Sequence, residues 1–94
     1  MSNSSISGHE KIKIYYTEYA REAMKQMQVS DEQVRKVIYY GEKSGEKLYA
    51  QGEERFLAKM ETDEITICAE YSPSEEKDTY VVHTVYAYKV KIKV

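Results

Sequence analysis

The fold is decided by the stretch YYTEYAREAMKQMQVSDEQVRKVIYYG, residues 15–41, which predicts two short capped helices in tandem. In the second, Ser30 is followed three residues later by Gln33, the pattern of a capping box. Val29 before the cap and Val34 after it are spaced as a hydrophobic staple. Gly41 occupies a position where glycine commonly ends a helix, so we expect the second helix to end there and a turn to follow over 41–45.

The first helix of the pair is predicted to begin after Thr17, whose hydroxyl can cap the free backbone N–H groups. Apolar residues then recur at helical spacing and form one stripe, namely Ala20, Ala23, Met24 and Met27. Val34, Val37 and Ile38 form the equivalent stripe of the second helix. Both stripes need an apolar surface on which to pack.

That surface is predicted by the segments of alternating polarity around the helices. Residues 11–15 alternate over a short, lysine-rich length that is typical of a sheet edge. Residues 47–50, 55–61 and 65–71 read as three further strands, and residues 72–78 as a solvated loop. Residues 79–94 are too long for one ordinary strand, so we expect a bulge, a bend or a tail beyond the sheet.

These elements predict an α+β domain in which two N-terminal helices pack on one face of an antiparallel sheet of about four strands, with an additional N-terminal edge strand. We expect residues 1–10 to be a disordered leader and residues 11–94 to form a single domain. Six alternating apolar residues would meet the helices: Phe56, Ala58, Met60, Ile65, Ile67 and Ala69. The other face would stay partly open and carry Arg55, Lys59, Thr66, Cys68 and Glu70.

Composition limits the classes of function. The formal net charge is -2, whereas nucleic-acid binding usually requires a basic excess or a basic stripe. Cys68 is the only cysteine, which excludes an intramolecular disulfide and fits a reducing cytoplasm. No apolar run approaches the ~20 residues of a membrane span. The ten tyrosines suit half-buried strand positions, and they also suit a surface that binds bases or a protein.

The block from Thr17 to Met24, the Val29-Ser30 cap, Gly41 and the closing segment 82–86 resemble a family of small domains of unknown function related to the BrnT and RelE-like toxins. The resemblance implies the α+β fold and, for many relatives, endoribonuclease activity. That family's first helix opens with a Ser/Thr-x-His-Ala-x-x-Arg pattern. Here Tyr19 stands at the His position and Ala23 at the Arg position, so the resemblance favours an inherited fold over inherited catalysis.

If the chain is a nuclease, four residues are the candidates for catalysis: Arg55, Lys59, His83 and Tyr86. Metal-independent RNA cleavage needs proton-transfer groups and cations for the phosphate. Arg55 and Lys59 share a strand face, where they also suit a solvated surface balanced by nearby glutamates, namely Glu53, Glu54 and Glu61. Strand parity places His83 and Tyr86 on opposite faces unless a bulge intervenes.

Two functions follow as alternatives. The sequence favours a non-catalytic module that binds a protein partner, or itself, through the open sheet face or an edge strand. The other is a metal-independent endoribonuclease toxin of a toxin–antitoxin pair, with RNA as its ligand. We expect no metal, since no ligand spacing supports one, and no cofactor, since a phosphate-binding glycine loop is missing from the sequence. We expect Cys68 to be a buried, inert thiol and the membrane to play no part.

Overall fold

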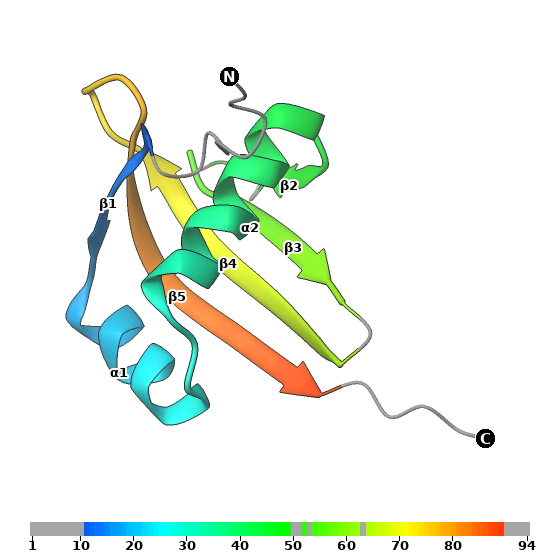
Figure 1. The fold of residues 1–94 in the computed structure, drawn as a ribbon. Helices are drawn as coiled ribbons and strands as arrows, with labels where there is room; N and C mark the ends of the chain where they lie inside the picture. The colour runs from blue at the N-terminus through cyan, green and yellow to red at the C-terminus, as the bar shows by residue number, and fades with distance from the viewer. Residues whose placement is uncertain (1–10, 50–51, 53, 63, 90–94) are drawn as a thin grey trace, which may run out of the picture.

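The computed structural model describes residues 11–49, 52, 54–62 and 64–89. In these residues two helices pack on one face of a five-stranded sheet (Figure 1). The elements follow one another as β1 (Lys13–Tyr16), α1 (Glu18–Met27), α2 (Asp31–Ser44), β2 (Lys47–Tyr49), β3 (Phe56–Glu61), β4 (Ile65–Pro73) and β5 (Thr79–Lys89). The predicted α+β class is confirmed. Residues 1–10 and 90–94, which include the predicted leader and tail, lie outside the described residues.

The sheet order is β1-β5-β4-β3-β2. Strands β2 to β5 are joined as successive antiparallel neighbours, and β1 occupies the edge beyond β5. The edge position of the N-terminal strand agrees with the prediction, but β1 runs parallel to β5. The chain path explains the direction: α1 and α2 carry the chain across the helical layer to the far edge, and three antiparallel connections return it to β5, next to β1 (Figure 1).

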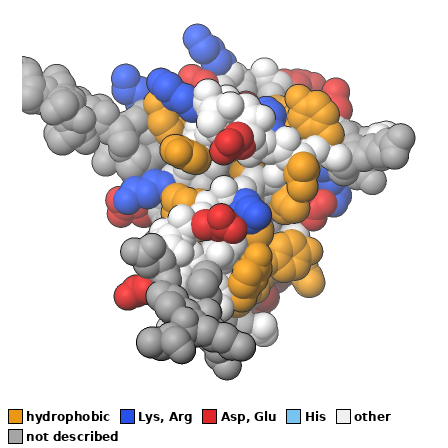
Figure 2. All heavy atoms as spheres, turned by 90° about the vertical axis from the view of Figure 1, so that its right-hand side faces the viewer, with side chains coloured by type: hydrophobic (Ala, Val, Ile, Leu, Met, Phe, Trp, Pro, Cys, Tyr) orange, Lys and Arg blue, Asp and Glu red, His pale blue; other side chains and the backbone are white. Residues whose placement is uncertain are grey.

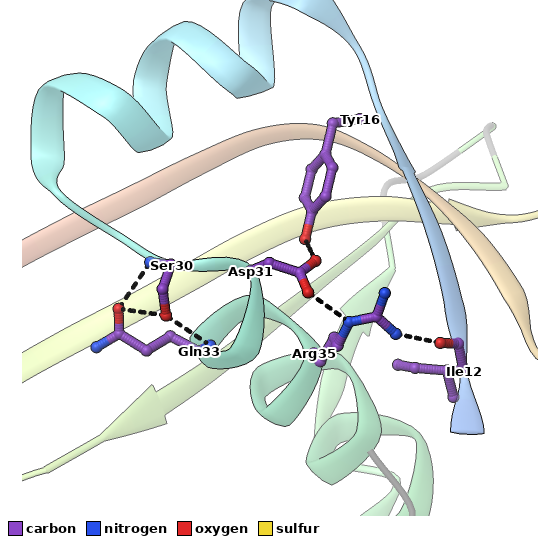
Figure 3. Close-up of polar contacts among 6 residues, drawn as sticks. All are labelled: Ile12, Tyr16, Ser30, Asp31, Gln33 and Arg35. Carbon is purple, nitrogen blue, oxygen red and sulfur yellow. Dashed lines mark hydrogen bonds and ion pairs between the residues drawn. The ribbon is translucent and has the colours of Figure 1, made fainter. Parts of the chain in front are cut away.

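The helix starts are capped as predicted. The backbone N–H of Ala20 donates to Thr17 Oγ1 at 3.1 Å. At the start of α2, the N–H of Gln33 donates to Ser30 Oγ at 3.2 Å, and the N–H of Ser30 donates to Gln33 Oε1 at 2.8 Å. This reciprocal pair is the capping box, and it satisfies two N–H groups that the helix itself leaves without partners (Figure 3).

The predicted end of α2 is wrong. Gly41 lies inside the helix, which continues to Ser44 and ends at Gly45 with φ of 78°. Residues 41–44 are therefore helical instead of a turn. Gly41 is buried against β3, and a Cβ added there would lie 2.9 Å from Cβ of Ala58. Glycine at this position allows the helix and the strand to approach closely.

The core forms where the helix stripes meet the alternating strand residues. Val34, Val37 and Ile38 of α2 and Ala20 of α1 have no exposed surface. Met24 and Met27 of α1 pack at the margin of the same core. On the sheet side, the core-facing residues of the three long strands are Phe56, Ala58, Met60, Ile65, Ile67, Ala69, Tyr71, Tyr80, Val82, Val85 and Ala87. The predicted inward face of β3 and β4 is confirmed.

A polar network ties β1 to the start of α2 (Figure 3). Tyr16 Oη donates to Asp31 Oδ1 at 2.5 Å, and Arg35 Nε donates to Asp31 Oδ2 at 2.6 Å. Arg35 also donates to the backbone oxygen of Ile12. Partial burial acts to raise the pKa of Asp31, but the hydrogen bonds from Tyr16 and Arg35 and the charge of Arg35 outweigh it and lower that pKa. The edge strand is thus held by side chains as well as by β5.

Candidate functional site

The candidate site is the sheet face that points away from the helices, which we call the open face. Register aligns its side chains in rows across the strands. One row runs through Leu48, Leu57, Glu70 and Thr84, and the next through Lys59, Cys68 and Tyr86. A third row holds Glu61, Thr66 and Tyr88. The predicted placement of Lys59, Thr66, Cys68 and Glu70 on this face is therefore confirmed.

Two residues at the centre of the open face are shielded from solvent. Thr66 and Cys68 are buried although no helix packs over them. Burial raises the pKa of the Cys68 thiol, and the opposing effects of Lys59 and of a hydrogen bond with Tyr88 are smaller. The thiol is therefore protonated at neutral pH and is a weak nucleophile, as expected. By contrast, Leu48 is 68% exposed, and Tyr86 and Tyr88 are 50% and 55% exposed.

A β-bulge in β5 decides where His83 lies. Glu70 pairs with Thr84, whereas its neighbour Tyr71 pairs with Val82, so His83 is the extra residue. Val82 and Val85 both reach the core although they are three residues apart. The bulge places His83 on the open face, on the same side of the sheet as Tyr86.

Ser72 fixes the position of His83. Ser72 Oγ lies 2.8 Å from Nε2 of the His83 ring, and Thr17 Oγ1 donates to the backbone oxygen of His83 at 3.1 Å. The sequence alone does not point to Ser72, because the following Pro73 favours a loop that begins there. The signal was the alternation itself: Ser72 continues the parity of Cys68 and Glu70 along β4, which runs to Pro73.

The two cations of the predicted set each lie beside a carboxylate. Arg55 Nη1 lies 3.6 Å from Glu70 Oε2, and Lys59 Nζ lies 3.5 Å from Glu61 Oε2. The expected pairing of Lys59 with Glu61 is observed, whereas Arg55 is balanced across the strands by Glu70. Glu53 lies outside the described residues. Since both pairs are partly exposed, they contribute little stability, but they neutralise the charge of this face.

A hollow of about 300 Å³ opens beside Leu48, and its walls include Leu57, Arg55, Glu70 and Tyr86, together with Tyr49 and Phe56 from the strand ends. Of the four predicted catalytic residues, Arg55 and Tyr86 line this hollow together. Lys59 and His83 lie on the same face but are not among the lining residues. The structure therefore brings the four onto one face without gathering them around one point.

A second hollow of about 300 Å³ lies at the C-terminal end of α2, and Lys11, Tyr39, Glu42, Lys43 and Tyr80 are among its walls. Beside it, Glu42 Oε2 accepts a hydrogen bond from Tyr71 Oη at 2.6 Å and pairs with Lys47 Nζ at 2.6 Å. Burial, followed by this hydrogen bond, raises the pKa of Tyr71. No motif in the sequence points to this group, whose contacts join α2 to the sheet.

The side of the molecule that lies to the right in Figure 1 exposes hydrophobic groups among basic and acidic side chains (Figure 2).

Among the described residues, no cluster of three or more His, Cys, Asp or Glu side chains is placed to hold a metal ion. Neither helix of the described chain combines the length and hydrophobicity needed to cross a bilayer. No protein-family model, curated protein or solved structure matches the chain.

Proposed function

We propose that the protein is a non-catalytic binding module whose open sheet face binds a protein. The observation that carries this proposal is the combination of exposed apolar side chains with neutralised cations. Leu48, Tyr86 and Tyr88 are at least half exposed on one face, and Arg55 and Lys59 lie beside carboxylates on that face. Aromatic residues are enriched at protein interfaces, and the rims of interfaces are polar.

RNA is the less favoured ligand. A nuclease must attract and hold a polyanion, which requires cations available to the phosphates. Here Glu70 and Glu61 repel phosphate at the places where Arg55 and Lys59 would bind it. The proposed cytoplasmic location rests on the single cysteine, which fits a reducing compartment.

One observation keeps a metal-independent endoribonuclease as the second candidate. The bulge brings His83 to the face that carries Arg55 and Tyr86, where an imidazole could exchange protons with RNA. The sequence resemblance to the RelE and BrnT toxins points the same way. Against it, Tyr19 and Ala23 replace the polar pair of that family's first helix.

Affinity capture from cells that contain the protein natively tests the first candidate. The bait is the tagged full chain, and the captured protein is either a different protein or an untagged copy of the chain. Leu48→Glu and Tyr86→Glu place a charge on the open face, whereas Tyr40→Glu makes the same change at a 58% exposed tyrosine on α2. The proposal expects capture by wild type and Tyr40→Glu and loss with the two face variants. Equal capture by all four proteins, or none by wild type, would contradict it.

A further inference from the structure

We infer that the partner of the open face is a second copy of this chain, packed face to face across a two-fold axis. The inference rests on the proposed function, because it uses the same surface. In a two-fold interface one patch meets itself, so each contact of residue i with residue j occurs twice. The patch must therefore carry both members of every complementary pair, and the open face does so in shape and in charge.

Shape provides the first pair. The hollow beside Leu48 and Leu57 is a recess of about 300 Å³. Two exposed phenol rings stand on β5: Tyr86, which lines the recess, and Tyr88, two residues further along the strand. A ring and a recess on the same face allow each copy to insert a tyrosine into the other. Aromatic anchors in apolar recesses usually supply much of the binding energy of an interface.

Charge provides the second pair. Arg55 and Glu70 both line the recess and lie 3.6 Å apart, so its rim carries one charge of each sign. Across a two-fold axis, Arg55 of one copy meets Glu70 of the second copy, and the reciprocal contact forms as well. A strongly acidic or strongly basic partner would instead repel one of the two residues. The rim is therefore more complementary to itself than to a partner of one charge sign.

The face is large enough for a stable dimer. The sheet has five strands, and β3, β4 and β5 contain 6, 9 and 11 residues. With strands about 4.8 Å apart and about 3.3 Å per residue, the flat projection of all five strands is on the order of 500 Å². Side-chain relief increases the accessible area, which brings it near the roughly 800 Å² per partner of a standard interface.

Sedimentation velocity of the purified full chain over a range of concentrations tests the inference. We expect wild type to sediment as a dimer that dissociates on dilution. Leu48→Glu and Tyr88→Glu should weaken dimerisation about tenfold or more, as loss of an interface anchor does. The matched control Tyr40→Glu on α2 should change the dissociation constant less than twofold. Circular dichroism checks that each variant is folded.

A charge exchange gives a second, independent readout. Arg55→Glu alone and Glu70→Arg alone should each be monomeric, because each places like charges at the rim. Mixed in equal amounts, the two variants should form a mixed dimer, since each chain now supplies the charge that the other lacks. If Arg55 and Glu70 interacted only within one chain, mixing the two variants would not restore dimerisation. A mixture that stays monomeric would overturn the face-to-face arrangement.

Two other outcomes overturn the inference. If the wild-type protein remains monomeric at every concentration, a second copy of the chain is not the partner. A dimer that the open-face variants leave intact must use another surface. In either case the proposed function is judged separately, because the capture experiment can still recover a different protein that depends on Leu48 and Tyr86.

Discussion

Ser72 Oγ and His83 Nε2 lie 2.8 Å apart across strands β4 and β5, and His83 is the extra residue of a bulge in β5. Without the bulge, strand parity would place His83 and Tyr86 on opposite faces of the sheet. With the bulge, the imidazole lies on the open face beside Ser72, near the end of β4, which continues to Pro73. One irregular residue therefore decides which chemical groups the open face presents.

We predict that Ile38→Ala lowers the free energy of unfolding by about 2 to 5 kcal/mol, the usual cost of emptying a buried isoleucine site. Ile38 has no exposed surface and belongs to the stripe of α2 that packs on the sheet. Domains of this kind have a total stability of about 5 to 15 kcal/mol, so the loss should be obvious in chemical denaturation. A denaturation midpoint equal to that of wild type would show that this helix face is not in the core.

We predict that Gly41→Ala destabilises the protein, although alanine is the better helix former by about 1 kcal/mol. The new Cβ would lie 2.9 Å from Cβ of Ala58, which sits on β3 and cannot rotate away. Overpacking of this kind costs about 1 to 3 kcal/mol. Chemical denaturation of the single variant measures the effect.

The matched control for this prediction is Ala58→Gly, alone and combined with Gly41→Ala. Removing the opposing methyl group should recover part of the stability lost in Gly41→Ala, and the double-mutant cycle isolates that recovery. A Gly41→Ala variant more stable than wild type would show that helix propensity, and not close packing, decides the residue at this position.

We predict that Asp31→Asn costs about 1 kcal/mol at neutral pH and progressively less in acid. The folded-state pKa of Asp31 lies below its ordinary value, through hydrogen bonds from Tyr16 and Arg35 that outweigh partial burial. Its charge therefore stabilises the fold above the unfolded pKa of about 4, and this contribution is lost as the pH falls through the lower folded value. Chemical denaturation at a series of pH values measures the difference between the two proteins.

Glu32→Gln is the control, because Glu32 lies in the same first turn of α2 and pairs with Lys36 at 3.7 Å in a more exposed place. It should show a smaller difference from wild type across the same series. If the gap between wild type and Asp31→Asn were to grow in acid, the assigned role of the carboxylate would be wrong.

We predict that the isolated protein does not cleave RNA, with or without ribosomes. Arg55 and Lys59 lie beside carboxylates, and the thiol of Cys68 is buried and protonated. The assay compares wild type with Arg55→Ala and His83→Ala, two variants that remove a phosphate cation and a proton-transfer group. Cleavage by wild type that either substitution abolishes would establish the enzyme and refute the binding module as the main function.

Local patterns in the sequence predicted the elements well. The spacing of Ser30 and Gln33 identified the capping box, and alternation in β3 and β4 identified the core face, because caps and strand parity depend on neighbouring residues. Features that depend on distant residues were not predictable in this way. The internal position of Gly41 follows from its contact with Ala58, and the parallel direction of β1 follows from the path of the whole chain.

In the candidate site, too, features set by neighbouring residues were predictable and features set by distant residues were not. Strand parity alone predicts that Lys59, Cys68 and Glu70 lie on the open face, and the observed register confirms this. The position of the bulge, and with it the face of His83, depends on how β4 and β5 fit over the core. The sequence predicts a loop at Ser72, since proline usually ends a strand, yet β4 includes both Ser72 and Pro73.

The claim that the open face is the binding surface can be checked by NMR, in which a soluble paramagnetic probe measures solvent accessibility. The isotope-labelled chain is measured in extract of the cells that contain it natively. We expect the signals of Leu48 and Tyr86 to be protected from the probe, whereas those of Tyr19 and Tyr40 on the helices remain accessible. Signals of Leu48 and Tyr86 as accessible as that of Tyr40, or protection confined to α1 and α2, would contradict the claim.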